Sequence, residues 1–458
     1  MASTLGAARL DGDGATIVSG TSHDSRAVLP GDLFCCIPGA VSDGHDHAAA
    51  AVASGAVGLL CERPLGLDVP ELVVSSVREA LGPVASLVAG RPSEHLQVIG
   101  LTGTNGKTTV VHLLGAIFDA AGRAAVTVGT LTGARTTPEA PELQAQLAQA
   151  VADGVAVVAM EVSSHALDQH RVDGTRFALV GFTNLSPDHL DHHGTMERYF
   201  AAKARLFTPA LADRAVVVTD DPHGRLLLDS AQIPTEGVGL EAAEDLVLSA
   251  GGSRFRWRGH PVDLRLAGRF NVRNALVAAE LARAVGVEPS AVASGLTGAP
   301  PVAGRLEPVD GGQPFAVLVD YAHTPDGLAQ VVAALREVGH GRLLVVFGCG
   351  GDRDATKRPL MGEAAAGADR VVLTTDNPRS EDPGAIIEAV RAGIPPDTDL
   401  AVEPDRRAAI ALALAEAVPG DIVLLAGKGH ETTQVVGDQV RAFDDRAVAL
   451  EVLREAAS

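Results

Sequence analysis

The chain has 458 residues, and at roughly 150 residues per domain this length predicts about three domains, each with its own core. Lysine and arginine together number 37 against 57 aspartates and glutamates, which gives a formal net charge of -20. Such a negative field repels nucleic-acid phosphates and anionic lipid head groups, so we expect neither nucleic-acid nor membrane partners. A hydrophobic content of 46% is typical of a chain that folds throughout.

The N-terminal segment contains no basic start followed by an apolar run, and the uncharged, alanine-rich segment at residues 47–61 is too short to cross a bilayer. The sequence therefore predicts a cytoplasmic protein. The cysteines show no C-x-x-C spacing and include an adjacent pair, so neither a zinc site nor a disulfide framework is indicated. We interpret them as buried thiols: Cys35, Cys36, Cys61 and Cys349.

Short strand-like runs at 32–38, 56–62 and 71–76 predict a small N-terminal α/β domain over residues 1–94. From residue 95 onward, short apolar runs alternate with helical stretches, a pattern that indicates a mainly parallel sheet with crossover helices. This central domain is predicted over residues 95–300. Its expected strands are 98–103, 124–129, 156–163 and 178–185, and its expected helices are 107–122 and 141–154.

A second alternating series predicts a C-terminal, Rossmann-like α/β domain over residues 301–458. A stretch rich in glycine and proline, residues 295–314, separates the two series and is the best linker candidate. The fold class is therefore α/β with three domains. The strands expected in this last domain are 315–322, 342–349, 370–376 and 421–429, and its helices are 328–335, 384–391 and 407–417.

The segment from Gly103 to Thr109, GTNGKTT, follows a predicted strand and opens a predicted helix, as a phosphate-binding loop requires. Glycines let backbone N–H groups approach phosphate oxygens, Lys107 can neutralise the β- and γ-phosphates, and the Thr108 hydroxyl can bind Mg²⁺. The common form G-x-x-x-x-G-K-[ST] has a glycine where this chain has Leu101, so the segment departs from that form. The alternative is an ordinary glycine-rich turn. We favour ATP binding and expect a P-loop ATPase domain.

Three further polar side chains are candidates for the same site. Glu161 ends a predicted strand at the edge where open α/β sheets bind ligands, so it could hold Mg²⁺ or could equally be a solvated glutamate. His189 lies in PDHLDHHG, where histidines crowd with Asp188 and Asp191, but a histidine is more often structural than a ligand. Lys203 lies in a helical segment, and a helical lysine is by default a solvated surface charge.

A series of motifs spans nearly the whole chain. In order they are TGTNGKTT, AMEVSSHALDQHR, TNLSPDHLDHHG, YFAAKARLF, GRFNVRNAL, DYAHTPDGL, FGCGGDRDATKRPLM, DNPR and GKGHE. In order and spacing they resemble the Mur ligases of peptidoglycan synthesis, and within that family the MurE type, which adds the third peptide residue. The resemblance runs from Asp24 to Glu431. It implies a three-domain enzyme whose central domain binds ATP and whose C-terminal domain closes onto it during turnover.

The resemblance also implies particular site residues. The catalytic set is Lys107, Glu161, His189 and Lys203. Thr108 and Glu161 match one Mg²⁺ site, and His189 and Lys203 match a second, in which the lysine carries a carbamate derived from CO₂. Carbamylation turns an ammonium that would repel Mg²⁺ into a carboxylate-like ligand, which displaces the surface-lysine interpretation. The implied ATP-binding residues are Gly103, Thr104, Asn105, Gly106, Lys107, Thr108, Thr109, Asn271, Asn274, Arg305 and Asp320.

Two substrates are implied besides ATP. The N-terminal domain is expected to hold the uridine diphosphate of UDP-N-acetylmuramoyl-L-alanyl-D-glutamate. The residues that match this substrate are Ser25, Ala40, Val41, Ser42, Thr136, Thr137, Ser163, Gln169 and Arg171. Those that match the incoming amino acid are Arg353, Asp376, Asn377, Pro378, Arg379, Gly427 and Glu431. Some relatives have other residues at the positions of Arg135 and His23, so contacts made there are open.

The incoming amino acid is expected to be diaminopimelate. Its second amino-acid end carries a carboxylate that suits a guanidinium and an ammonium that suits a carboxylate, which Arg379 and Glu431 could supply. Lysine-adding relatives lack the arginine of DNPR, so Arg379 favours diaminopimelate. From spacing alone, however, Arg379 could equally pair with Glu381 or Asp382.

The sequence thus predicts an ATP-dependent amide ligase that acts through an acyl phosphate, as a monomer. The motifs contain glycines, cations and metal ligands and no nucleophilic serine or cysteine, which indicates catalysis by positioning and electrostatics. The alternatives are the same chemistry with L-lysine or another amino acid, and a non-catalytic nucleotide-binding relative.

Overall fold

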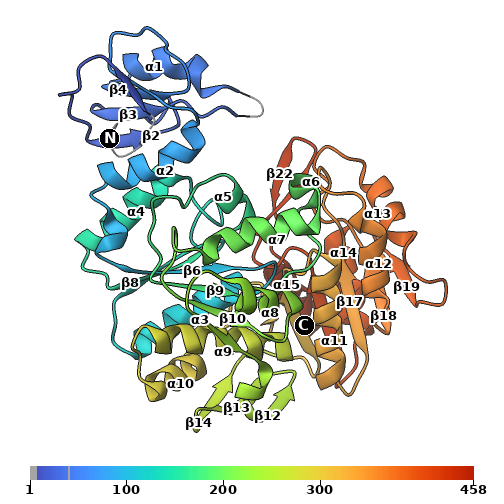
Figure 1. Ribbon diagram of the computed structural model, residues 1–458. Coiled ribbons are helices and arrows are strands. Elements are labelled where there is room, and N and C mark those ends of the chain that lie inside the picture. Colours follow the sequence, from blue (N-terminus) through green and yellow to red (C-terminus); the bar gives the residue numbers. More distant parts are fainter. Residues whose placement is uncertain (1–7, 40–41, 458) are drawn as a thin grey trace.

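The computed structural model describes residues 8–39 and 42–457. The N-terminal part is a small sheet with the strand order β1-β5-β4-β3-β2, in which only the pairing of β1 with β5 is antiparallel. It stands apart at one end of the molecule and adjoins the central part through α2, which packs against α4 (Figure 1). The elements are β1 (Arg9–Asp11), β2 (Gly20–Ser22), β3 (Asp32–Cys35), β4 (Gly58–Cys61), β5 (Glu71–Val73), α1 (Ala48–Ala53) and α2 (Val77–Val88).

The central part is built on a parallel sheet with the order β11-β10-β9-β6-β8-β7. From β6 the chain goes to β7 at the edge of the sheet, returns to β8 beside β6, and then crosses to β9 on the other side of β6, so β6 lies where the strand order reverses. Ligands of open α/β sheets bind at such a switch point. The strands are β6 (Gln97–Thr102), β7 (Ala125–Val128), β8 (Val157–Glu161), β9 (Leu179–Phe182), β10 (Ala215–Val218) and β11 (Thr235–Val238).

Successive strand residues pack on opposite faces of this sheet. Ile99 belongs to one core with α3, α9 and α10, whereas Val98 belongs to another with α4, α5 and α7. These two cores explain why β8, β9 and β10 are buried along their whole length. The helices are α3 (Lys107–Ala120), α4 (Ala140–Ala152), α5 (Ser164–Asp168), α6 (Leu190–His193), α7 (Met196–Ala204), α8 (Pro222–Ser230), α9 (Arg269–Ala284) and α10 (Pro289–Gly298).

An antiparallel sheet that the sequence analysis did not predict follows the central one. Its strands are β12 (Glu244–Ser249), β13 (Gly252–Trp257) and β14 (His260–Leu264). Buried and exposed residues alternate along β13 and β14, as in a sheet with one face on the core. Phe255 and Trp257 are buried in the same core as α3 and α9. The sheet therefore extends the central part at the side away from the N-terminal domain (Figure 1).

The C-terminal part is a second open sheet with the order β15-β16-β20-β17-β18-β19, parallel except for β15. Helices cover both of its faces, as expected for a Rossmann-like domain. The elements are β15 (Glu307–Pro308), β16 (Ala316–Asp320), β17 (Leu343–Phe347), β18 (Arg370–Leu373), β19 (Leu400–Val402), β20 (Ile422–Ala426), the hairpin β21 (Thr433–Val436) and β22 (Gln439–Ala442), α11 (Pro325–Val338), α12 (Lys357–Ala365), α13 (Pro383–Arg391), α14 (Arg406–Glu416) and α15 (Asp445–Ala457).

The predicted boundaries after residues 94 and 300 fall in loops between the sheets, before β6 and between α10 and β15. All four cysteines are buried and unpaired with one another, as predicted. Burial raises the pKa of Cys36 and Cys349 to about 12, so these thiols stay protonated at neutral pH. Within residues 8–39 and 42–457, no helix combines the length and the apolar character that crossing a membrane requires.

Candidate active site

The segment after β6 forms a tight loop at the N-terminus of α3. Gly106 has a φ of 90°, and a side chain there would collide with Oδ1 of Asn274, so this position requires glycine. The Nζ of Lys107 donates to the carbonyl oxygens of Gly103 and Thr104 at 2.9 and 3.0 Å. Burial lowers the pKa of Lys107 below its ordinary value. The predicted P-loop geometry of strand, loop and helix is therefore present, with the lysine folded across the loop.

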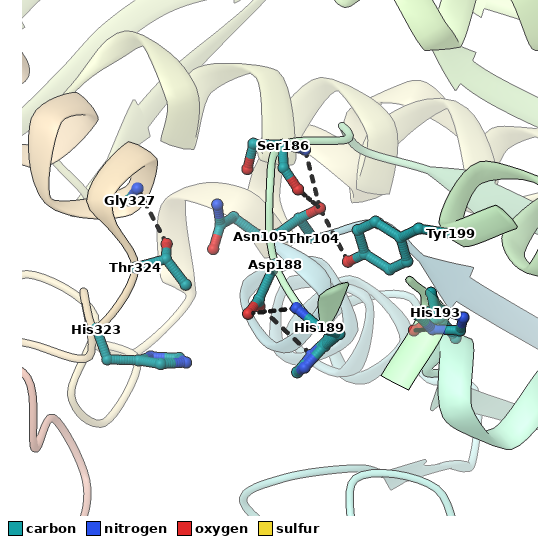
Figure 2. Close-up of polar contacts among 12 residues, drawn as sticks. Thr104, Asn105, Ser186, Asp188, His189, His193, Tyr199, His323, Thr324 and Gly327 are labelled. Atoms are coloured by element: carbon teal, nitrogen blue, oxygen red, sulfur yellow. Dashed lines mark hydrogen bonds and ion pairs between the residues drawn. The ribbon is translucent and has the colours of Figure 1, made fainter. Parts of the chain in front are cut away.

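Neighbouring segments hold this loop in place. The Thr104 Oγ1 lies 3.1 Å from the Tyr199 hydroxyl of α7 and accepts the N–H of Ser186 at 3.0 Å (Figure 2). The backbone N–H of Asn105 donates to Asn184 Oδ1 at 2.9 Å. Because these partners follow β9 or lie on α7, the loop is fixed by contacts that are distant in the sequence.

His189 lies beside the loop, in the segment after β9. It has a left-handed backbone with a φ of 54°, and its N–H donates to Oδ1 of Asp188 at 2.9 Å. Burial lowers its pKa. His323, from the loop after β16, extends towards this pair from the C-terminal domain (Figure 2). Burial and the charge of Lys357 lower the pKa of His323 to about 4, so both imidazoles are neutral at physiological pH.

Glu161 ends β8 and forms a candidate metal centre with Thr108. Its side chain is buried, so the solvated-glutamate interpretation is wrong. Oε2 of Glu161 accepts the Thr108 hydroxyl at 3.0 Å, and Oε1 accepts the N–H of Thr130 at 2.8 Å. From the C-terminal domain, Nη2 of Arg305 approaches the Thr108 Oγ1 to 3.4 Å. A carboxylate and a hydroxyl beside a phosphate-type loop are the oxygen donors that Mg²⁺ prefers.

Lys203 is 1% exposed, so the surface-lysine interpretation is wrong. Its Nζ donates to the carbonyl oxygen of Gly103 at 2.9 Å and lies 4.6 Å from the centre of the Tyr199 ring. Burial and the nearby charge of Lys107 lower its pKa well below the ordinary value. In the part of the chain that the structure describes, no carboxylate lies within ion-pair distance of this amine. The unprotonated amine is the form that reacts with CO₂, and a lowered pKa increases its share.

The residues expected near the adenine and ribose lie on α9 and at the end of β16. Asn271 donates from Nδ2 to the carbonyl of Ala267 at 2.9 Å, and Asn274 lines a cavity of about 120 Å³ beside the loop. The carboxylate of Asp320 accepts the N–H groups of Leu306 and Ala322 at 2.7 and 2.8 Å. Asp320 therefore fastens the segment that carries Arg305.

A cavity of about 680 Å³ lies between the central and C-terminal domains. It brings the two predicted substrate groups together, because the loops after β7 and β8 face the loops after β16, β17, β18 and β20. Predicted UDP-sugar residues in its lining are Thr136, Thr137, Ser163 and Arg171, next to His189. Predicted amino-acid residues in its lining are Arg353, Asp376, Asn377, Arg379, Gly427 and Glu431.

Some predicted substrate residues do not line this cavity. Oε1 of Gln169 accepts a hydrogen bond from the guanidinium of Arg171 at 2.7 Å, so Gln169 supports a residue that lines the cavity. Pro378 lies within the DNPR loop but its side chain is not part of the lining, and Ser25 and Ser42 lie in the N-terminal domain. Ala40 and Val41 lie outside the described residues.

The amino-acid end of the cavity has a defined polar geometry. Nη1 of Arg379 donates to the carbonyl of Gly351 at 2.7 Å, whereas Glu381 pairs with Arg358 at 2.8 Å. Among the described residues, Arg379 forms no ion pair with Glu381 or Asp382, so that alternative is wrong, and Arg379 lines the cavity. Nδ2 of Asn377 donates to Glu431 Oε2 at 2.7 Å.

Three family models match successive parts of the chain. They are the Mur ligase family catalytic domain at residues 17–89, the Mur ligase middle domain at 101–282 and the Mur ligase glutamate ligase domain at 304–429. A UDP-N-acetylmuramoyl-L-alanyl-D-glutamate–2,6-diaminopimelate ligase of Streptomyces avermitilis is 44% identical, with 99% of this chain and 96% of that protein covered. The chain belongs to the Mur ligase family.

Other Mur ligases agree with this assignment. A protein of the same name from Geobacillus kaustophilus is 44% identical, with 94% of each chain covered. A solved structure of a ligase of that name superposes with a TM-score of 0.69 at 34% identity, over 96% of each chain. MurF from Thermotoga maritima, solved in complex with ADP, shares the fold with a TM-score of 0.66 at 19% identity, over 97% of this chain and 98% of that one.

The sequence analysis missed several residues of this Mur ligase site. Glu139, buried, joins Arg78 of the N-terminal domain at 2.9 Å to Arg171 at 3.0 Å. Lys428 is fully buried behind Glu431, and Lys357 lines the cavity. The composition could have pointed to both lysines, because lysine is rare in this chain: the 37 basic residues include only four lysines, Lys107, Lys203, Lys357 and Lys428. All other cations are arginines, and every lysine lies at or beside the candidate site.

Proposed function

We propose that this chain is an ATP-dependent ligase that joins diaminopimelate to UDP-N-acetylmuramoyl-L-alanyl-D-glutamate in peptidoglycan precursor synthesis. Its curated relatives at 40–46% identity carry that name. The single observation that carries the proposal is the 680 Å³ cavity, which joins Thr136 and Arg171 to Arg379 and Glu431 beside the P-loop. One cavity that holds both substrates next to a phosphate site suits a reaction that couples them.

ATP is the proposed co-substrate, held by Gly103 to Thr109 with its adenine towards Asn271 and Asn274 and Arg305 near its phosphates. The left-handed Gly106 lets the loop turn directly into α3, and the N-terminus of α3 offers backbone N–H groups to a phosphate. The buried Nδ2 of Asn105 and Nε of Arg305 have no hydrogen-bond partner among the described residues. Such orphaned donors fit an anionic ligand that supplies acceptors.

The residues present fit Mg²⁺ as well. Thr108 and Glu161 would hold one ion, and His189 with carbamylated Lys203 would hold another. When bound, Mg²⁺ neutralises the charge that develops on the transferring phosphoryl oxygens. The carbamate would form when the unprotonated amine of Lys203 attacks the carbon of CO₂: a nitrogen–carbon bond forms, the π pair of one C=O bond moves to oxygen, and the nitrogen loses a proton to water.

The proposed reaction has two steps. The D-glutamyl carboxylate attacks the γ-phosphorus of ATP in line, the bond to the β–γ bridging oxygen breaks, and ADP and an acyl phosphate result. The α-amine of diaminopimelate then attacks the acyl carbon, loses a proton and expels phosphate, which leaves the amide. Lys107 leaves its carbonyl partners to neutralise the phosphoryl oxygens, and Arg305 brings a second cation from the other domain.

A phosphate-release assay with purified UDP-dipeptide and ATP tests the proposal. Diaminopimelate should support release and L-lysine should support little, because lysine has no second carboxylate for Arg379. The Lys107→Ala variant serves as the blank and should release none. Turnover with lysine but not with diaminopimelate would reassign the substrate, and tight ATP binding without turnover on any amino acid would favour the non-catalytic alternative.

We also propose that the protein acts as a monomer in the cytoplasm, with domains at 1–94, 95–300 and 301–458. The cavity is complete within one chain, since both of its walls come from the same polypeptide. The sedimentation of the protein at the concentration used in the activity assay tests whether it is a monomer.

A further inference from the structure

Lys428 lies behind the wall of the cavity and not in it. The residue follows β20, its side chain is 0% exposed, and its Nζ donates to the carbonyl oxygen of Thr433 at 2.6 Å. The same ammonium lies 3.4 Å from Asn377 Oδ1 and 3.4 Å from Glu431 Oε2. A buried lysine therefore reaches two residues that line the amino-acid end of the cavity.

Both donors converge on one oxygen of Glu431. Asn377 Nδ2 and Lys428 Nζ contact Oε2, at 2.7 and 3.4 Å. Within residues 8–39 and 42–457, Oε1 has no hydrogen-bond partner, and Glu431 lines the cavity. Anchoring one oxygen of a carboxylate leaves the other available to an incoming donor.

The position of Lys428 also balances charge. Asp376 Oδ1 lies 3.8 Å from its Nζ, so the ammonium stands between the carboxylates of Asp376 and Glu431. Burial raises the pKa of Asp376, because a negative charge is costly so far from water. Gly427 precedes the lysine with a φ of 108°, and a Cβ there would lie 2.7 Å from Asp376 Oδ2, so glycine lets the chain pass this close.

We propose that Lys428 is a positioning residue for amino-acid recognition: with Asn377 it fixes Oε2 of Glu431, so that Oε1 is presented to an ammonium of the incoming amino acid. This inference rests on the proposed function, in which Glu431 receives the distal ammonium of diaminopimelate. It extends that function to a residue that does not touch the substrate. Removing the cation leaves Arg406 to offset both neighbouring carboxylates, and their stronger repulsion should turn Glu431 away from its present position.

The test is the steady-state kinetics of Lys428→Met with each substrate varied in turn. We expect the KM for diaminopimelate to rise about tenfold to a hundredfold, as for one lost charge-assisted contact. The kcat and the KM values for ATP and UDP-dipeptide should stay near those of the wild type. Lys428→Gln keeps a donor for Thr433 but removes the charge, and it provides the same test if the Met variant does not fold.

A double-mutant cycle separates positioning from a general structural role. If Lys428 acts through Glu431, the variant with both Lys428→Met and Glu431→Gln should be no worse than Glu431→Gln alone. The matched control is Arg446→Met, which removes a positive charge from an exposed pair with Glu307 in the same domain and should change none of these constants.

Two results would overturn the inference: an unchanged KM for diaminopimelate in both Lys428 variants, or losses that multiply in the double variant. Failure of the proposed function is distinguishable, because in that case the wild-type enzyme itself would release no phosphate with diaminopimelate.

Discussion

Replacing Arg379 by alanine should selectively weaken the use of diaminopimelate. The backbone at this position is held by hydrogen bonds to the β21 strand on both sides, with its N–H to Val435 O at 3.1 Å and its carbonyl to Gly437 N at 2.7 Å. The substitution therefore removes the guanidinium without moving the loop. Among the residues that the structure describes, Nη1 alone of this guanidinium has a protein acceptor, the carbonyl of Gly351, so the remaining N–H groups can bind a carboxylate in the cavity.

One charge-assisted contact is worth about 1.5 to 3 kcal/mol, which corresponds to a loss of about 12-fold to 160-fold in kcat/KM for diaminopimelate. L-lysine has no second carboxylate, so its slow turnover should not change, and the ratio of the two specificity constants should fall by the same factor. The assay is phosphate release with each amino acid, and the control is Arg391→Ala, which removes an exposed guanidinium of α13. An unchanged ratio would refute the assignment of Arg379 to the distal carboxylate.

Three further predictions concern chemistry, stability and pH. Lys203→Ala should be nearly inactive, and a short carboxylic acid in the buffer should restore part of the phosphate release if a carbamate is what the residue contributes; no rescue at any concentration would contradict that role. Arg406→Met should lower the free energy of unfolding by about 3 to 5 kcal/mol in urea titrations, because it leaves Asp445 charged and buried, with both side chains 0% exposed in the native pair. The double variant with Asp445→Leu should recover much of that loss, and equal losses would contradict the reasoning. Burial and neighbouring histidines lower the pKa of His165 to about 4 from 6.5, so the unfolded chain binds this proton more readily and stability should fall as pH drops from about 6.5 to about 4. Between about pH 6.5 and pH 4, the urea concentration at the unfolding midpoint should fall less for His165→Asn than for the wild type. Identical pH profiles for the two proteins would show that His165 does not contribute to this loss of stability.

The outcome for Lys203 shows where sequence reasoning reaches its limit. Its helical spacing predicts an exposed side chain, whereas α7 packs on the P-loop and buries the amine against Gly103. Nothing local distinguishes this lysine from a surface one, because its environment comes from a segment one hundred residues earlier. Only the family resemblance, which implies a carbamylated metal-binding lysine, argued against a surface position. The rarity of lysine in an arginine-rich chain was an available signal, and it would also have singled out Lys428.

The sheet of β12 to β14 was missed for a different reason. Apolar and polar residues alternate along β13 and β14, but each strand places only a few apolar residues on its buried face. These strands also come after a series that predicts a parallel sheet, so a short antiparallel sheet was not expected there. The helices α9 and α10 were missed as well, although α9 carries Asn271 and Asn274. The order of the parallel strands also lay beyond the pattern, because alternation indicates crossover connections and does not say on which side the next strand is added.

By itself, the sequence determined what depends on near neighbours in the chain: the alternation of apolar strands and helices, the glycine that opens α3, and the placing of Lys107 and Thr108 on that turn. These features follow from backbone and side-chain preferences over a few residues. Only the tertiary structure decided which strand ends meet, and with them the cavity in which Thr136 faces Arg379 and the buried lysine behind Glu431. Such contacts depend on the packing of separate sheets, which no local periodicity encodes.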